Sequence, residues 1–336
     1  MDHQRKALKT GAAALILAIS LRLVGGGILN PLAQVLQEPA ALSFLVYLQT
    51  GRAVRFAEAA PVPTIVETQP AETTVPQATE TTQPEDKPVF SLEDLENVSV
   101  TYGCGYQPDL QSLLLSPLDW DLMGDEPTVL IVHTHATEGY AKTEYEDYEE
   151  LYAYRTLDDR YNMVSIGDEV ARVLEAGGIH VLHDRTYHDY PDYNHSYINA
   201  RESIAAYLEQ YPSIKMVLDI HRDASDGADG SQLVTVGTVG GQRSAQLMVV
   251  VGTDASGNYH PNWQQNLALA LKLSAQLERT DPGLTRAVNL RSERFNMDMT
   301  TGSLLIEVGG AGNTHSEAIL AANALARAIL ALAEGT

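Results

Sequence analysis

Three apolar runs between residues 128 and 308 carry titratable side chains at or near their ends. These side chains are His133 and His135 after residues 128–132, His221 after residues 214–220, and Glu307 within residues 304–308. Neutral imidazoles and carboxylates are the ligands that hydrolytic zinc sites use, with one coordination position left for water. Zinc lowers the pKa of that water to about 7, and a carboxylate that is not a ligand can then move its proton. The three runs therefore predict a hydrolytic metal site.

Glu307 is the most informative of these residues. It lies in an otherwise apolar segment, where a carboxylate is costly unless it has a partner or a function. His133 and His135 are two residues apart, so an extended chain would point both to the same side, with Glu138 three residues further on. A lone histidine more often makes a local hydrogen bond than binds a metal, and Asp219 could be a core carboxylate bonded to backbone. Both readings stay open at this point.

Other catalytic arrangements are missing from the sequence. Cys104 is the single cysteine, which excludes an intrachain disulfide and a cysteine-rich zinc site. The chain has no glycine-rich phosphate loop and no Gly-x-Ser-x-Gly motif. His180, His183, His188 and His195 cluster among aromatic and acidic residues, where surface hydrogen bonding or a place at the rim of a substrate groove is expected.

The hydrophobic pattern around these residues alternates between strands and helices. Strands are predicted over residues 128–132, 179–182, 214–220, 246–251 and 304–308, and helices over residues 163–176, 196–208, 262–277 and 315–332. Such alternation is typical of an α/β fold with a mostly parallel sheet and helices on both faces. Ligands bind at the carboxyl ends of the strands in these sheets. The histidines at positions 133, 135 and 221 follow such strands, and Glu307 lies near the end of one. We therefore expect these residues to meet at one edge of the sheet.

The N-terminal region has the pattern of a membrane anchor. Arg5, Lys6 and Lys9 precede an apolar run over residues 11–29, which approaches the roughly 20 residues that a membrane-spanning helix needs. The positive flank predicts that the N-terminus stays in the cytoplasm. Arg22 lies near one end of the run, where its side chain can reach the headgroups. A cleaved signal peptide is the alternative, but the run exceeds a typical signal-peptide core.

The remaining boundaries follow from composition. Residues 1–30 are assigned to the cytoplasmic tail and anchor, 31–60 to a juxtamembrane segment, 61–88 to a linker, 89–127 to a transitional region and 128–336 to the catalytic domain. The linker is rich in proline, threonine and acidic residues, so it has little to bury and should be disordered. A formal net charge of −22 argues against nucleic acid as a partner, because phosphates would be repelled.

Several motifs resemble one known family. The segments HTHATEGY, VLDIHRDA and LLIEVGGAGNT, together with the block from residue 161 to residue 197, are similar to stage II sporulation protein P. That family belongs to the larger group of zinc-dependent N-acetylmuramoyl-L-alanine amidases. The resemblance covers residues 128–336, and the N-terminal anchor and variable linker also fit the family's layout.

The resemblance implies roles for individual residues. Zinc ligands are expected at His135 and His221, and the catalytic glutamate at Glu307. General amidases place a further glutamate ligand before the first long helix, where this chain has Asp158, Asp159 and Asn162 instead. We therefore assign the third ligand to Glu138, with His133 as its substitute or an acid near Asp159 as a further alternative. Arg201 and Arg222 are assigned as substrate-orienting residues.

The resemblance also implies an activity and a setting. The expected reaction is cleavage of the amide between the lactyl group of N-acetylmuramic acid and L-Ala of the stem peptide, with peptide cross-links as a second target. The expected place is the septal and mother-cell membrane during forespore engulfment, with the sporulation proteins D, a lytic transglycosylase, and M, a membrane protein, as partners. A metal-dependent endopeptidase or carboxypeptidase, and a non-catalytic wall-binding scaffold, are the alternatives.

Overall fold

The structure, a computed structural model, describes residues 90–118, 121–225 and 231–334. The expected anchor, juxtamembrane segment and linker lie outside these residues. The strands are β1 (Val100–Tyr102), β2 (Val129–Val132), β3 (Val181–His183), β4 (Met216–Asp223), β5 (Gly237–Val239), β6 (Gln242–Ser244), β7 (Leu247–Gly252), β8 (Val288–Arg291) and β9 (Gly302–Gly310). The α-helices are α4 (Leu92–Glu96), α5 (Leu110–Leu115), α6 (Met163–Ala176), α7 (Ser196–Gln210), α8 (Trp263–Thr280) and α9 (His315–Glu334), with 3-10 turns η1 (Tyr193–His195) and η2 (Met297–Met299).

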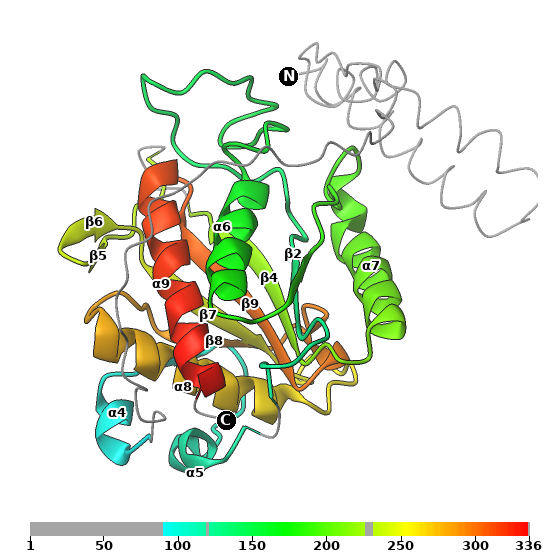
Figure 1. The fold of residues 1–336 in the computed structure, drawn as a ribbon, viewed down its shortest axis with the longest axis vertical. Coiled ribbons are helices and arrows are strands. Elements are labelled where there is room, and N and C mark those ends of the chain that lie inside the picture. Colours follow the sequence, from blue (N-terminus) through cyan, green and yellow to red (C-terminus); the bar gives the residue numbers. More distant parts are fainter. Residues whose placement is uncertain (1–89, 119–120, 226–230, 335–336) are drawn as a thin grey trace, which may run out of the picture. The chain divides into compact units, whose positions relative to one another are not determined.

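Seven strands form one sheet in the order β1-β8-β7-β9-β4-β2-β3, and β5 and β6 form a separate hairpin (Figure 1). Strands β3, β2, β4 and β9 are mutually parallel. Strand β7 pairs with β9 antiparallel and with β8 parallel. The sheet therefore consists of two parallel blocks that run in opposite directions. The carboxyl ends of β2, β4 and β9 meet at one edge, and the pairing confirms the predicted mostly parallel architecture.

Helices cover both faces of the sheet, as the alternation predicted. Helices α6, α8 and α9 pack on one face, and α6 and α9 lie side by side in Figure 1. Leu218 and Ile220 of β4 point into that core, while Val217 packs with Ile204 of α7 on the opposite face. Because side chains alternate along a strand, Asp219 and His221 share the α7 face with Val217.

Local sequence explains where α6 begins and ends. The Asn162 side chain accepts a hydrogen bond from the Val164 amide at 3.0 Å, so it caps the first turn. Fully buried apolar residues then recur at helical spacing, among them Ile166 and Val170. The helix ends before Gly177, and Gly178 adopts a positive φ of 90° that a side chain would disfavour. This end was predicted from the Gly-Gly pair.

The folded unit begins earlier than predicted. Strand β1 pairs with β8 at the edge of the sheet, and α5 packs on α8. Asp94 of α4 forms an ion pair with Arg279 of α8, with 2.5 Å between the Asp94 carboxylate and Arg279 Nε. The boundary at residue 128 was therefore too late. The segment escaped prediction because its helices and strand are short and gain their stability from distant partners.

We expect Asp94→Asn to destabilise the protein by about 1–2 kcal/mol at pH 7, because hydrogen bonds to charged groups are strong and this pair is only partly exposed. The Arg279 guanidinium lowers the pKa of Asp94. The unfolded chain then binds protons more readily, so this stabilisation is complete above the unfolded pKa of about 3.9 and is lost as pH falls through the lower folded pKa. Urea unfolding at pH 7 and below pH 3 measures it. An equal difference between variant and wild type at both pH values would contradict the prediction.

Helix α9 is the one described helix whose length and composition would suit a membrane span. It packs against α6, α8 and the sheet, and residues such as Ala322, Leu325 and Ile329 are fully buried. Its apolar character is therefore explained by its place in the core.

Candidate metal centre

The candidate site lies at the carboxyl ends of β2, β4 and β9. His221 of β4 and Glu307 of β9 are register partners on adjacent parallel strands, so their side chains project from the same face. This is the face that α7 covers. Asp219, two residues before His221, projects on that face as well. The predicted meeting of strand-end residues is therefore present for the middle and last strands.

The chain turns directly after β2. The amide and the hydroxyl of Thr134 donate hydrogen bonds to the Asp219 carboxylate at 2.8 and 2.6 Å. These bonds hold the turn against β4. The Glu138 amide then donates to the His135 carbonyl at 3.1 Å, so these two residues lie on one turn. The prediction that His133 and His135 face the same side was wrong, because the strand ends at Val132 and an extended chain no longer connects them.

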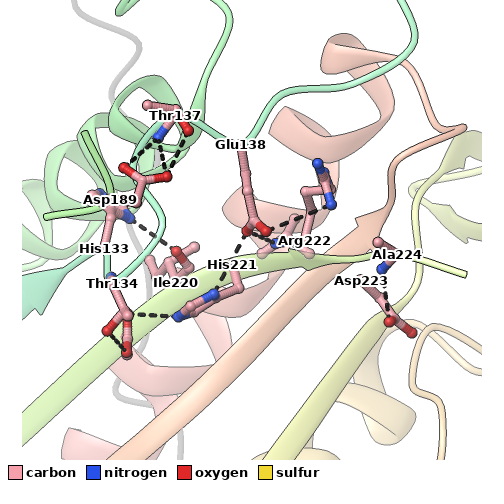
Figure 2. Close-up of polar contacts among 12 residues, drawn as sticks. His133, Thr134, Thr137, Glu138, Asp189, Ile220, His221, Arg222, Asp223 and Ala224 are labelled. Carbon is pink, nitrogen blue, oxygen red and sulfur yellow. Dashed lines mark hydrogen bonds and ion pairs between the residues drawn. The ribbon is translucent and has the colours of Figure 1, made fainter. Parts of the chain in front are cut away.

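His221 lies between the carboxylates of Glu138 and Asp219, and Figure 2 shows its contact with Glu138. Its Nδ1 is 3.6 Å from Glu138 Oε2, and its Nε2 is 2.8 Å from Asp219 Oδ1, although that contact has poor hydrogen-bond alignment. Burial lowers the pKa of His221, but the Asp219 and Glu138 charges outweigh it and hold the pKa well above its ordinary value. Burial raises the pKa of Glu138, but Arg222 and His221 outweigh it and hold that pKa well below the usual range.

The Glu138–His221 pair has the separation expected of two zinc ligands. Ligands about 2.1 Å from a tetrahedral zinc ion lie roughly 3.4 Å apart, close to the 3.6 Å between Glu138 Oε2 and His221 Nδ1. Zinc-bound histidines commonly hold a carboxylate with the other ring nitrogen, and Asp219 is at that position. The chemistry and spacing of this pair therefore fit a metal.

His135 supplies a third donor atom, a second nitrogen, close to this pair. Its ring centroid is 5.3 Å from that of His221, and its buried Nδ1 has no hydrogen-bond partner. Burial lowers the pKa of His135 to about 4, so the imidazole is neutral at pH 7. The ring stacks on Tyr193 of η1, with 4.6 Å between centroids. An unpartnered neutral imidazole is the form that a metal requires.

Among the described residues, no three histidine, cysteine, aspartate or glutamate side chains converge closely enough to enclose a metal ion as they stand. The set of His135, Glu138 and His221 therefore needs side-chain adjustment to bind one. The donor types, the 3.6 Å separation of Glu138 and His221 and the unpartnered Nδ1 of His135 are the features of this set that fit zinc.

Glu307 lies next to this group without pairing to it. Its Oε2 is buried and has no hydrogen-bond partner, although the residue as a whole is partly exposed. Burial raises the pKa of the Glu307 carboxyl to about 8, and His221 opposes this shift. Because burying such a group without a partner is costly, its place beside His221 points to a function.

His133 is held elsewhere. Its Nδ1 is 3.0 Å from the Ile220 carbonyl and its Nε2 is 2.8 Å from His183 Nε2, so both ring nitrogens are in use. Burial lowers its pKa to about 3. The structure therefore favours Glu138 over His133 as the third ligand. The acids before α6 are also engaged, since Asp158 pairs with Arg160 and Asp159 with Arg185.

We expect Gly167→Ala to destabilise the protein by up to about 2 kcal/mol. A Cβ on Gly167 of α6 would lie 2.5 Å from His183 Nε2 and 2.6 Å from His133 Nε2, between rings that are already bonded. Overpacking of this kind costs about 1–3 kcal/mol, which outweighs the gain of about 1 kcal/mol in helix propensity. Urea unfolding measures the change. Gly124→Ala is the control, since nothing lies within 4 Å of that position, and an equal or smaller loss at Gly167 would refute the prediction.

The two arginines assigned to substrate contact by homology have other partners. Arg201 forms a two-pronged ion pair with Asp298, at 2.8 Å for each nitrogen. Arg222 is buried, lies 3.5 Å from Glu138 Oε1, and donates to the carbonyl oxygens of Gly139 and Tyr154. Arg222 is thus placed to hold Glu138, and Arg201 to hold η2 against α7.

Sequence reasoning missed three residues around the site. Arg155 forms ion pairs with Glu138 and Asp189, and Tyr193 covers the His135 ring. Arg155 and Asp189 lie in loops and Tyr193 in the short turn η1, and none of these segments has hydrophobic periodicity. The available signal was the dense aromatic and acidic composition of residues 184–197, which was noted only as a groove rim.

The sequence comparisons decide the family. The model of the family described as stage II sporulation protein P matches residues 44–330. The chain belongs to that family. Stage II sporulation protein P of Bacillus subtilis (strain 168) is 28% identical to this family member over 214 residues, which are 60% of this chain and 50% of the relative. The chain thus spans about half the length of the curated relative that it matches.

Solved structures of N-acetylmuramoyl-L-alanine amidases are similar at a lower level. Those of Nostoc punctiforme and Clostridium difficile 630 are each 16% identical with a TM-score of 0.36, and they cover 61% and 62% of this chain and 95% and 94% of their own. The apo amidase of Mycobacterium abscessus is 12% identical with a TM-score of 0.35, over 61% of this chain and 95% of its own. The family assignment rests on the sequence match.

Proposed function

We propose that the protein is a zinc-dependent peptidoglycan hydrolase, an N-acetylmuramoyl-L-alanine amidase that acts during forespore engulfment. The observation that carries this proposal is the 3.6 Å approach of Glu138 Oε2 to His221 Nδ1, with Glu307 in register beside His221 on the next strand. Membership in the sporulation protein P family supports peptidoglycan as the substrate. His135, Glu138 and His221 would hold the zinc ion.

The chain's own residues divide the work at this site. Bound zinc would supply Lewis acidity that makes water a competent nucleophile near neutral pH. Glu138 contributes negative charge, and Asp219 lies 2.8 Å from His221 Nε2, on the side of the ring away from Glu138. His135 contributes a neutral nitrogen. The Tyr193 ring shields His135 from solvent on its stacked face.

Glu307 is the proton carrier in this proposal. It takes a proton from the attacking water while the water oxygen bonds to the lactyl carbonyl carbon. It then gives the proton to the amide nitrogen of L-Ala as the carbon–nitrogen bond breaks, so a free amine and a free carboxyl group result. Burial raises the pKa of the Glu307 carboxyl, and the positive charge of a bound metal would lower it, so the carboxylate could take the proton and then return it.

The cellular placement is part of the same proposal. The apolar run over residues 11–29 would anchor the chain in the septal and mother-cell membrane, and residues 61–88 would tether the catalytic domain outside it. Family membership supports the sporulation proteins D and M as partners. Division of labour with a transglycosylase is chemically reasonable, because one enzyme removes stem peptides and the other cuts the glycan.

Mass spectrometry of the products from purified peptidoglycan tests this function. The full chain in detergent, loaded with zinc, should release peptides that begin with free L-Ala and leave glycan strands without stems. Treatment with a chelator should abolish release, and zinc should restore it. Cleaved cross-links with stems still attached to muramic acid would show an endopeptidase instead. Wall binding without any new product would show a scaffold.

A further inference from the structure

Arg155 links two parts of the site that the proposed function treats separately. Its Nη2 is 3.1 Å from Glu138 Oε1, while its Nη1 is 2.9 Å from Asp189 Oδ2 and 3.0 Å from the Thr137 hydroxyl. The side chain of Arg155 is only 10% exposed, and those of Glu138 and Asp189 are 7% and 0% exposed. Charge pairs this well buried and this geometrically defined are strong compared with surface pairs.

The two oxygens of Glu138 have different partners. Oε1 accepts from Arg155 and lies 3.5 Å from Arg222 Nη1, whereas Oε2 faces His221 Nδ1 at 3.6 Å. Oε2 also accepts from the Arg222 amide at 3.2 Å. The guanidinium groups therefore hold Oε1, which leaves Oε2 aimed at the partner ligand. Without these contacts to Oε1, rotation of the Glu138 carboxylate would move Oε2 away from His221.

Arg155 also reaches the loop above His135. Its guanidinium carbon lies 4.9 Å from the ring centroid of Tyr193, and Tyr193 stacks on His135. Asp189, the second ion-pair partner, lies just before Tyr193 in the chain. Its carboxylate accepts hydrogen bonds from the amide and the hydroxyl of Thr137. One side chain thus contacts Glu138 directly and His135 through Tyr193.

The backbone places Arg155 opposite Glu138 independently of its side chain. Residues Glu138 and Arg155 form an antiparallel bridge. The Gly139 amide donates to the Tyr154 carbonyl at 2.8 Å, and the Thr156 amide donates to the Thr137 carbonyl at 2.9 Å. A change of the Arg155 side chain therefore leaves these contacts available, so its variants are expected to keep the local fold.

We propose that Arg155 is a positioning residue for the metal centre, which orients Glu138 so that Oε2 faces His221. This inference rests on the proposed function. Hydrogen-bond partners of metal ligands typically account for 10–100-fold in metal affinity. Lysine in place of Arg155 keeps the charge but cannot make the forked contacts to Glu138 and Asp189 together.

The test is zinc affinity of the full chain, measured by competition with a chromogenic chelator. Arg155→Met should weaken zinc binding by about 10–100-fold, and Arg155→Lys by less. Arg160→Met is the matched control, because that exposed arginine pairs with Asp158 and has no contact with Glu138. Wild-type affinity in folded Arg155→Met would overturn the inference. Absence of zinc binding by the wild type would instead overturn the proposed function, and this inference with it.

Asp189→Asn separates positioning from mere folding. It breaks the Arg155–Asp189 pair but leaves the Glu138 contact in place. Under the inference it lowers the unfolding temperature while zinc affinity stays near that of the wild type. A role in stability alone predicts that Arg155→Met and Asp189→Asn both lower the unfolding temperature and both keep zinc affinity. That result would also overturn the inference.

Discussion

Glu307→Gln should lower the turnover of peptidoglycan by about 10²–10⁴-fold while the protein stays folded, because that is the usual contribution of a positioned acid or base. Glutamine has nearly the same shape but cannot carry the proton from water to the leaving amine. Glu307 has no ion-pair or hydrogen-bond partner at its buried Oε2, so the substitution breaks no contact there. The measurement is the rate at which peptides that begin with L-Ala are released. Zinc content and unfolding temperature of the variant are measured alongside.

The control for this variant is Glu317→Gln. Glu317 pairs with Arg243 and bonds Asn313 at the start of α9, so the same chemical change there should affect stability and spare turnover. A structural role for Glu307 would lower stability or zinc content together with activity. Wild-type turnover in folded, zinc-loaded Glu307→Gln would eliminate Glu307 as the proton carrier.

His221→Ala should remove most of the bound zinc, from about one ion per folded chain in the wild type. The variant loses the nitrogen that faces Glu138, and the Asp219 and Glu138 carboxylates lose the imidazole ring between them. Because breaking a buried charge arrangement is costly, a fall in unfolding temperature is expected as well. Zinc content of the purified chain is measured by atomic emission after removal of free metal.

His315→Ala controls for loss of a partly buried histidine, since His315 bonds Ser165 outside the site. Two further variants decide the third ligand. Glu138→Gln should lose zinc, whereas the folded fraction of His133→Ala should retain it, because both nitrogens of His133 are bonded to other groups. Full zinc content in His221→Ala would show that the assigned ligand set is wrong. Loss in His133→Ala alone would move the third ligand there.

Much of the fold follows from local patterns. Strand β2 is a continuous apolar run, β4 and β9 are buried runs interrupted by polar residues, and α6 has a capping asparagine, an apolar stripe and a Gly-Gly end. These features depend on residues a few positions apart in the chain, so they can be predicted from the sequence. The antiparallel joining of β7 to β9 and the addition of β1 are different, because strand pairing brings together residues far apart in the chain.

The sequence by itself determined that His221 and Glu307 belong together, since a polar group at the end of an apolar strand lies at the sheet edge. Only the tertiary structure separated His133 from His135, because Asp219 holds Thr134 and turns the chain after Val132. It also brought Arg155 to Glu138 through a loop pairing that no periodicity encodes. Strand-end chemistry is set by local pattern, whereas the partners that orient it come from loops positioned by packing.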